Sequence, residues 1–81
     1  MYSEVISRAG IFEGTIKATD WDEGGNVLEM SLVDQDSREY PIYMDLKAES
    51  LTEYCKEKLR IKGTIQGGYL YINSFKFLRR R

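Results

Sequence analysis

Apolar and polar residues alternate along most of this chain. Residues 10–21 show the pattern best, because polar side chains there separate four apolar or small residues, Phe12, Gly14, Ile16 and Ala18. Successive side chains of a β-strand point to opposite faces, so a period of two predicts a strand with one buried face. The same reasoning predicts four more strands, at residues 27–33, 39–46, 59–66 and 69–78. The alternation therefore predicts a mostly β protein.

One segment breaks this pattern. Residues 50–53 read Ser-Leu-Thr-Glu, a capping box in which Ser50 and Glu53 each satisfy a backbone N–H at the start of a helix. An apolar stripe at helical spacing overlaps it, formed by Leu51, Tyr54, Cys55 and Leu59. The sequence predicts a short helix within residues 50–59, between the third and fourth strands.

Glycine and proline mark irregular positions in the strands. Gly14 lies among the inward residues of the first strand, where a glycine indicates a bend or bulge that curls the strand. Pro41 lacks the N–H of a ladder bond, so its end of the third strand is predicted to be an edge or a bulge. The residues predicted to point inward from the second and third strands are Leu28, Met30, Leu32, Tyr40, Ile42 and Met44.

The last strand changes phase along its length. Leu70 and Ile72 share one parity, whereas Phe75 and Phe77 share the other. A bulge near residues 73–74 would return both phenylalanines to the core, and this is the favoured interpretation. The alternative is that both rings are exposed.

The predicted elements follow the order β-β-β-α-β-β. Residues 12–17 (FEGTIK) recur in kind at residues 61–66 (IKGTIQ), so the first and fourth strands carry a glycine at the same place. With the helix after the third strand, this arrangement resembles the OB-fold superfamily of five-stranded barrels. The resemblance covers about residues 10–78 and is one of topology. It implies one OB-fold domain over residues 1–81, an all-β (small α+β) fold with one capping helix. An SH3-like barrel is the alternative.

Composition excludes several kinds of chemistry. The chain has no histidine and one cysteine, Cys55, so ordinary zinc sites and Ser-His or Cys-His catalysis are excluded. A domain of 81 residues cannot hollow out its core for a substrate, so we expect a non-enzymatic protein without a cofactor or metal. The sequence contains neither a run of 18 apolar residues nor the features of a signal peptide, so we expect a cytoplasmic protein without membrane contact.

Exposed aromatic residues suggest where a ligand would bind. OB folds that bind ligands use the outer face of strands two and three and the adjoining loops, which implies a site near Tyr43 and Trp21. Tyr69 and Tyr71 share an outward parity on the last strand, and aromatic rings on such a surface can stack with bases. Together with the cations able to contact phosphates, the candidate nucleic-acid-binding residues are Lys17, Trp21, Tyr43, Lys62, Tyr69, Tyr71, Lys76, Arg79, Arg80 and Arg81.

Charge leaves two kinds of partner nearly equal. The net charge of −1 lacks the basic excess expected of a duplex-binding protein, and the acidic first loop, residues 20–23, would repel phosphates. The leading hypothesis is a binding module for single-stranded nucleic acid. The alternative is a module for protein–protein contact or a homodimer, in which Tyr69 and Tyr71 cover the end of the barrel and the terminal arginines form a solvated tail.

Overall fold

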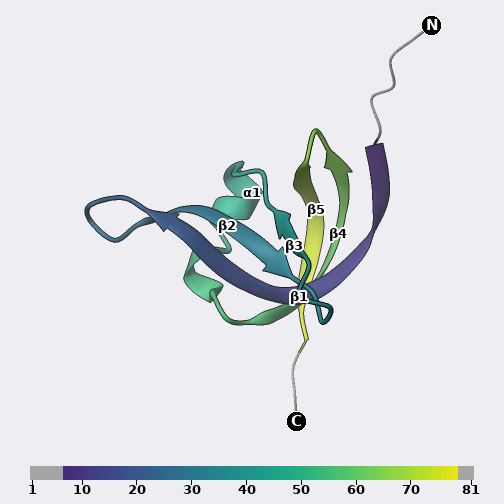
Figure 1. Cartoon of the computed structure of the whole chain (residues 1–81), viewed down its shortest axis with the longest axis horizontal. Coiled ribbons are helices and arrows are strands. Elements are labelled where there is room, and N and C mark those ends of the chain that lie inside the picture. Colours follow the sequence, from purple (N-terminus) through teal and green to yellow (C-terminus); the bar gives the residue numbers. More distant parts are fainter. Residues whose placement is uncertain (1–6, 79–81) are drawn as a thin grey trace, which may run out of the picture.

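The computed structural model describes residues 7–78, with side chains described from residue 9 onward. Five antiparallel strands form one sheet in the order β3-β2-β1-β4-β5 (Figure 1). The strands are β1 (Ser7–Trp21), β2 (Val27–Val33), β3 (Glu39–Pro41), β4 (Lys58–Gln66) and β5 (Tyr69–Phe77). The helix α1 (Leu46–Glu49) and the 3₁₀ turn η1 (Thr52–Tyr54) lie between β3 and β4. The expected small α+β class, with five strands and one short helix before the fourth, is confirmed.

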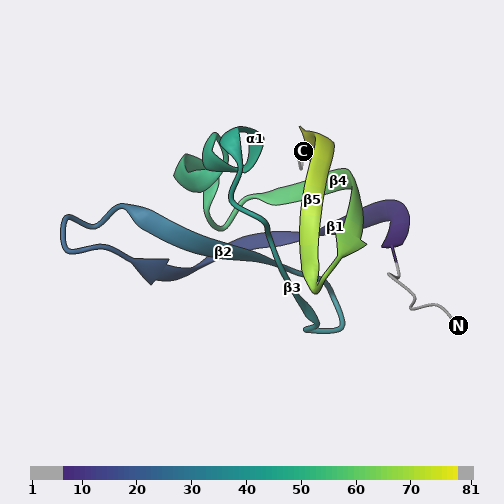
Figure 2. The same ribbon diagram turned by 90° about the horizontal axis from the view of Figure 1, so that it is seen from above.

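The long strand β1 serves two halves of the sheet. Its first half, from Ser7 to Thr15, pairs with β4, and its second half, from Thr15 to Trp21, pairs with β2. Gly14 lies next to this change of partner. A Cβ atom there would stand 2.3 Å from the carbonyl oxygen of Val33, so only glycine permits this close approach of β2. Beyond the change of partner, the β1–β2 hairpin projects from the body of the molecule (Figures 1 and 2).

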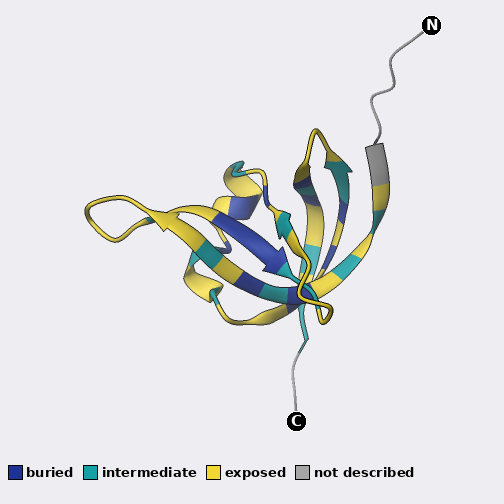
Figure 3. Cartoon of the chain, in the orientation of Figure 1, coloured by how far each residue is buried: buried dark blue, intermediate teal, exposed yellow. Residues whose placement is uncertain are grey.

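The hydrophobic core is formed by residues of β1, β2, β4 and β5 and of the segment 42–51, which contains α1 (Figure 3). The alternation predicts most of the buried strand residues correctly. The prediction for Leu28 is wrong, because its side chain is 47% exposed and does not point into the core. The register between β1 and β2 shifts at this point and leaves Leu28 as an extra residue, which explains the error. The buried apolar residues are Ile16, Met30, Leu32, Ile42, Ala48, Leu51, Leu59, Ile61, Leu70 and Ile72.

The helix begins earlier than predicted. The carboxylate of Asp45 accepts a hydrogen bond from the N–H of Ala48 at 3.0 Å, so Asp45 and not Ser50 is the N-cap. Ser50 instead ends α1, and its hydroxyl donates to the carbonyl of Lys47 at 2.7 Å. The α-helix predicted within residues 50–59 is therefore wrong, and the 3₁₀ turn η1 lies there instead. Leu51 is buried as predicted, but it lies between α1 and η1 rather than in a continuous helix.

The third strand ends earlier than predicted. It stops at Pro41, not at residue 46, because the chain then leaves β2 and approaches β5. Ile42 forms an isolated parallel bridge with Leu70, and the N–H of Tyr43 donates to the carbonyl of Leu70 at 2.9 Å. Within residues 7–78, this bridge is the place where the segment after β3 pairs with β5, at the two edges of the sheet.

The bulge predicted in the last strand is confirmed. Lys62 pairs with Ser74 and Gly63 pairs with Ile72, so Asn73 is the extra residue. As expected, the bulge turns Phe75 and Phe77 back to the core, where both are partly buried. None of the helices in the described part of the chain has the length and hydrophobicity needed to cross a bilayer.

Candidate binding surface

Three tyrosines from two distant parts of the chain meet on the outer surface. The ring of Tyr43 stacks on that of Tyr71, with centroids 4.5 Å apart and planes inclined by 20°. Tyr69 meets Tyr43 edge-on at a centroid distance of 6.3 Å. Tyr43 and Tyr69 are 44% and 46% exposed, and Tyr71 is half-buried. We call these three residues the tyrosine cluster.

Local structure explains why the cluster forms. Gly67 and Gly68 adopt positive φ angles of 61° and 86°, which make a tight turn between β4 and β5. Tyr69 and Tyr71 then alternate with the buried Leu70 on β5, so their side chains lie on the outer face. The Tyr43–Leu70 hydrogen bond holds Tyr43 beside them.

Two lysines follow the cluster along the outer face of β4 and β5, and a third approaches β5 from α1. Lys62 and Lys76 are exposed on the outer faces of β4 and β5, where Lys62 pairs with Ser74 and Lys76 with Arg60. The ammonium group of Lys47 on α1 donates to the carbonyl oxygen of Asn73 at 2.8 Å, two residues beyond Tyr71 on β5.

Sequence reasoning missed Lys47. The alternation predicts a strand up to residue 46 and the capping box predicts a helix from residue 50, so no pattern puts residue 47 against β5. The bulge at Asn73 was predicted, but nothing in the sequence indicates that its carbonyl would accept a bond from a lysine.

The structure separates Lys17 and Trp21 from the cluster. Lys17 lies on the half of β1 that pairs with β2, and its ammonium group is paired with Glu39 at 3.2 Å. Trp21 is 54% exposed at the end of β1, on the projecting hairpin. Arg79, Arg80 and Arg81 lie outside the described residues. The structure thus brings together Tyr43, Tyr69 and Tyr71, with Lys62 and Lys76 on the same outer face.

The acidic first loop is remote from the tyrosine cluster. It forms the tip of the β1–β2 hairpin, which projects away from the β4–β5 hairpin (Figure 1). Asp22 accepts hydrogen bonds from the backbone N–H and the side-chain amide of Asn26 and from the N–H of Gly24. These bonds, led by the one from the Asn26 backbone, lower the pKa of Asp22 and keep it ionised. Its negative charge therefore stays at the tip and does not oppose phosphates at the cluster.

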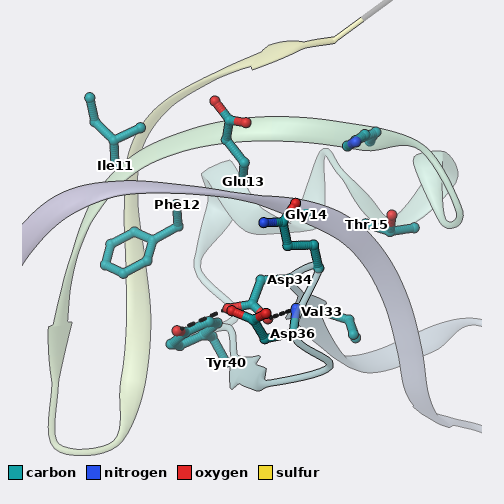
Figure 4. Close-up of a pocket in the computed structure, with 11 residues that line it drawn as sticks. Ile11, Phe12, Glu13, Gly14, Thr15, Val33, Asp34, Asp36 and Tyr40 are labelled. Carbon is teal, nitrogen blue, oxygen red and sulfur yellow. Dashed lines mark hydrogen bonds between the residues drawn. The ribbon is translucent and has the colours of Figure 1, made fainter.

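Apart from the tyrosine cluster, the surface has a concavity beneath β1 at Gly14 (Figure 4). It has a volume of about 480 Å³, and Phe12 and Tyr40 form its apolar side with ring centroids 5.5 Å apart. The carboxylate of Asp34 accepts from the Tyr40 hydroxyl at 3.3 Å and from the N–H groups of residues 36 and 38, so the β2–β3 turn already uses it. In the described part of the chain, no group of three potential ligands could hold a metal ion.

Comparison with protein-family models, with curated proteins and with solved structures finds no significant match to this chain. Its function is therefore inferred from its own residues.

Proposed function

We propose that the sheet is an OB-type barrel that acts as a binding module. The order of the strands, the helix before β4 and the pairing of β1 with both β2 and β4 all support this assignment. The parallel Ile42–Leu70 bridge supports closure, because it joins β5 to the residue that follows β3, and β3 and β5 form the edges of an open sheet. In such a barrel the tyrosine cluster lies on the outer wall, where β3 approaches β5.

The proposed ligand is single-stranded nucleic acid. The observation that carries this proposal is the meeting of Tyr43, Tyr69 and Tyr71 on an exposed surface. Tyr43 and Tyr71 already cover one face of each other, so the rings of Tyr43 and Tyr69 offer the accessible surface for bases. Stacking of a base on an aromatic side chain contributes about 1–3 kcal/mol and tolerates any base, because every base has a π-face.

The lysines along β5 supply the contacts to phosphates. Lys62 and Lys76 lie on the outer face that contains the cluster, and Lys47 approaches β5 from α1, so a strand that stacks on the tyrosines would pass near them. Three phosphate contacts on a single strand give a slope of log affinity against log salt of about −2. This weak dependence on salt agrees with the net charge of −1, and stacking must supply most of the affinity.

A labelled single-stranded oligonucleotide of mixed sequence tests this function. Binding is measured by fluorescence polarisation at low salt. Tyr69→Ala should weaken binding by at least about fivefold, the equivalent of 1 kcal/mol of stacking, whereas Tyr69→Phe should retain it. Lys62→Ala should make the salt slope shallower by about 0.7.

Tyr54 provides the matched control. It is 41% exposed, about as much as Tyr69, but it packs against Phe77 and not against the cluster. Tyr54→Ala should therefore leave oligonucleotide binding unchanged. The proposal fails if the wild-type protein binds nothing at tens of micromolar, or if Tyr54→Ala and Tyr69→Ala weaken binding equally.

A protein partner is the second candidate, and the balanced charge of the chain favours it. Tyrosine is enriched in protein interfaces, because it combines a large apolar area with a hydrogen-bonding hydroxyl. The two candidates are separated by a pull-down with and without nuclease. A partner that remains after nuclease treatment and is lost with Tyr69→Ala would assign the cluster to a protein ligand.

A further inference from the structure

The projecting part of the β1–β2 hairpin, residues 17–30, is called the arm. Each of its strands contains one extra residue, Thr19 in β1 and Leu28 in β2, so its register shifts twice. A bulge absorbs one residue of the alternation. Trp21 therefore lies opposite Val27, on the face of the arm that also carries Ala18. Because of the two bulges, the side chain of Trp21, the only tryptophan of the chain, lies on the same face of the arm as Ala18; we call this face the underside of the arm.

A groove runs along this underside. It has a volume of about 640 Å³, and its lining is mainly apolar. Ala18, Trp21 and Val27 line it from the arm, and Thr52 and Cys55 line it from η1 and the segment that leads to β4. Two lysines, Lys17 and Lys56, also belong to its lining. Trp21 remains 54% exposed, so the groove is open at this end. This surface is separate from the tyrosine cluster.

The edge of β1 beside the groove is open. The N–H and carbonyl groups of Ile16 bond to Glu57 and Lys56 on this side, and β4 extends no further along β1. Backbone groups of a strand alternate between its two sides, so those of Ala18 point the same way as those of Ile16, away from β2. Among the described residues, no backbone group is recorded as bonded to Ala18 on this side. An unpaired edge of this kind accepts an added strand.

Charge selects the kind of strand. The arm carries four carboxylates, Asp20, Asp22, Glu23 and Glu29, all exposed. They outnumber the two lysines that line the groove, Lys17, which is paired with Glu39, and Lys56 beside Cys55. A segment that lies along β1 would place its end beside this acidic tip, so the arm favours basic residues there.

We propose that the groove binds an extended, basic segment of a partner protein, which adds to the edge of β1 at Ala18. The backbone of the segment pairs with the N–H and carbonyl groups of Ala18. Its aliphatic side chains enter the groove between Trp21 and Cys55, and its basic residues lie near Asp20 and Glu23. This is recognition by strand addition, in which main-chain bonds give affinity and the groove gives selectivity.

Trp21 reports occupancy of the groove directly, because it is the only tryptophan. The probe is the synthetic peptide KTVTVTK, which alternates valine and threonine and has a lysine at each end. Its binding should shift the Trp21 emission to shorter wavelength, since it replaces water around the indole. It should also slow alkylation of Cys55, which lines the opposite wall. The proline peptide KTVPVTK and the acidic peptide ETVTVTE should do neither.

Two variants test the two parts of the proposal. Ala18→Pro removes the N–H at the open edge and should weaken KTVTVTK binding about three- to tenfold, the value of one hydrogen bond; circular dichroism checks that the sheet remains. Glu23→Lys leaves the backbone unchanged, and no hydrogen bond is recorded for the Glu23 side chain within the described chain. This charge reversal should weaken KTVTVTK about two- to fivefold and strengthen ETVTVTE.

Several results would overturn the proposal. If KTVTVTK leaves the emission unchanged up to millimolar concentration, the groove does not accept an added strand. Equal binding of KTVPVTK would exclude backbone pairing. A shift that appears when the protein alone is concentrated would assign the groove to a second copy of this chain. A shift caused by an oligonucleotide would assign it to nucleic acid.

Discussion

Gly14 tolerates no side chain, and substitution by alanine measures how tightly β1 and β2 are packed. A Cβ atom at this position would lie 2.3 Å from the carbonyl oxygen and 2.8 Å from the carbonyl carbon of Val33, and 3.1 Å from Cα of Asp34. All three are backbone atoms, so no side chain can rotate away. The carbonyl oxygen would have to move by about 0.7 Å, from 2.3 to 3.0 Å, to reach even the shortest tolerated contact. Overpacking of this kind costs about 1–3 kcal/mol, and the rigid backbone places Gly14→Ala at the upper end.

Thermal or urea unfolding measures this cost. For a domain of this size, 1 kcal/mol shifts Tm by about 4–8 °C, so Gly14→Ala should lower Tm by roughly 8 °C or more. Gly10→Ala is the matched control on the same strand. Its Cβ would meet nothing closer than 3.7 Å, so this variant should keep or slightly raise Tm. If Gly14→Ala unfolds within 2 °C of the Gly10→Ala protein, the close approach at Val33 does not constrain the fold.

Two further outcomes test the turn after β2 and the approach of the two edges. Asp34 has a pKa below its ordinary value of 3.8, chiefly because its carboxylate accepts a hydrogen bond from the backbone N–H of Arg38. The contribution of this bond to the stability of the fold is therefore complete above about pH 4. It is lost as the pH falls through the folded-state pKa of Asp34. The Tm of Asp34→Asn should therefore fall less than that of the wild type when the pH is lowered below about 4. If Tm falls equally with pH in both proteins, this linkage is excluded. The amide of Tyr43, bonded to Leu70, should exchange with deuterium far more slowly, when followed by NMR, than the amide of Glu23 in the first loop, which has no hydrogen-bond partner within residues 7–78. Fast exchange at Tyr43 would mean that the edges of β3 and β5 do not stay together.

The strands could be predicted from the sequence because their signal is local. Alternation identifies each strand, and the slip of parity between Ile72 and Phe75 identifies the bulge at Asn73. The same method fails at Leu28, because the bulge there has no comparable aromatic marker on its far side. A period of two predicts which face a residue lies on only where the strand has no bulge, because an extra residue reverses the parity of those that follow it.

The helix and the binding surface depend on contacts between distant residues. Ser50 and Glu53 match a capping box, yet Asp45 is the N-cap and starts the helix five residues earlier, so that the helix ends where the capping box predicts its start. The parity of Tyr69 and Tyr71 indicates an outward face, but only the approach of residue 42 to Leu70 brings Tyr43 into contact with them. Neither the capping of α1 by Asp45 nor the contact between residue 42 and Leu70 produces a periodic pattern in the sequence.

The shared strand β1 also determines the order in which this chain can fold. The β1–β2 and β4–β5 hairpins each close over a short loop, so both can form early and independently. Pairing between β1 and β4 joins residues as distant as Ser7 and Gln66, and closing so long a loop is slow. We therefore expect the last step to be the docking of two preformed hairpins along the first half of β1. Until that step is complete, the edges of β1 and β4 that will pair with each other are both exposed, so this interval is when the chain is most prone to pair with other molecules.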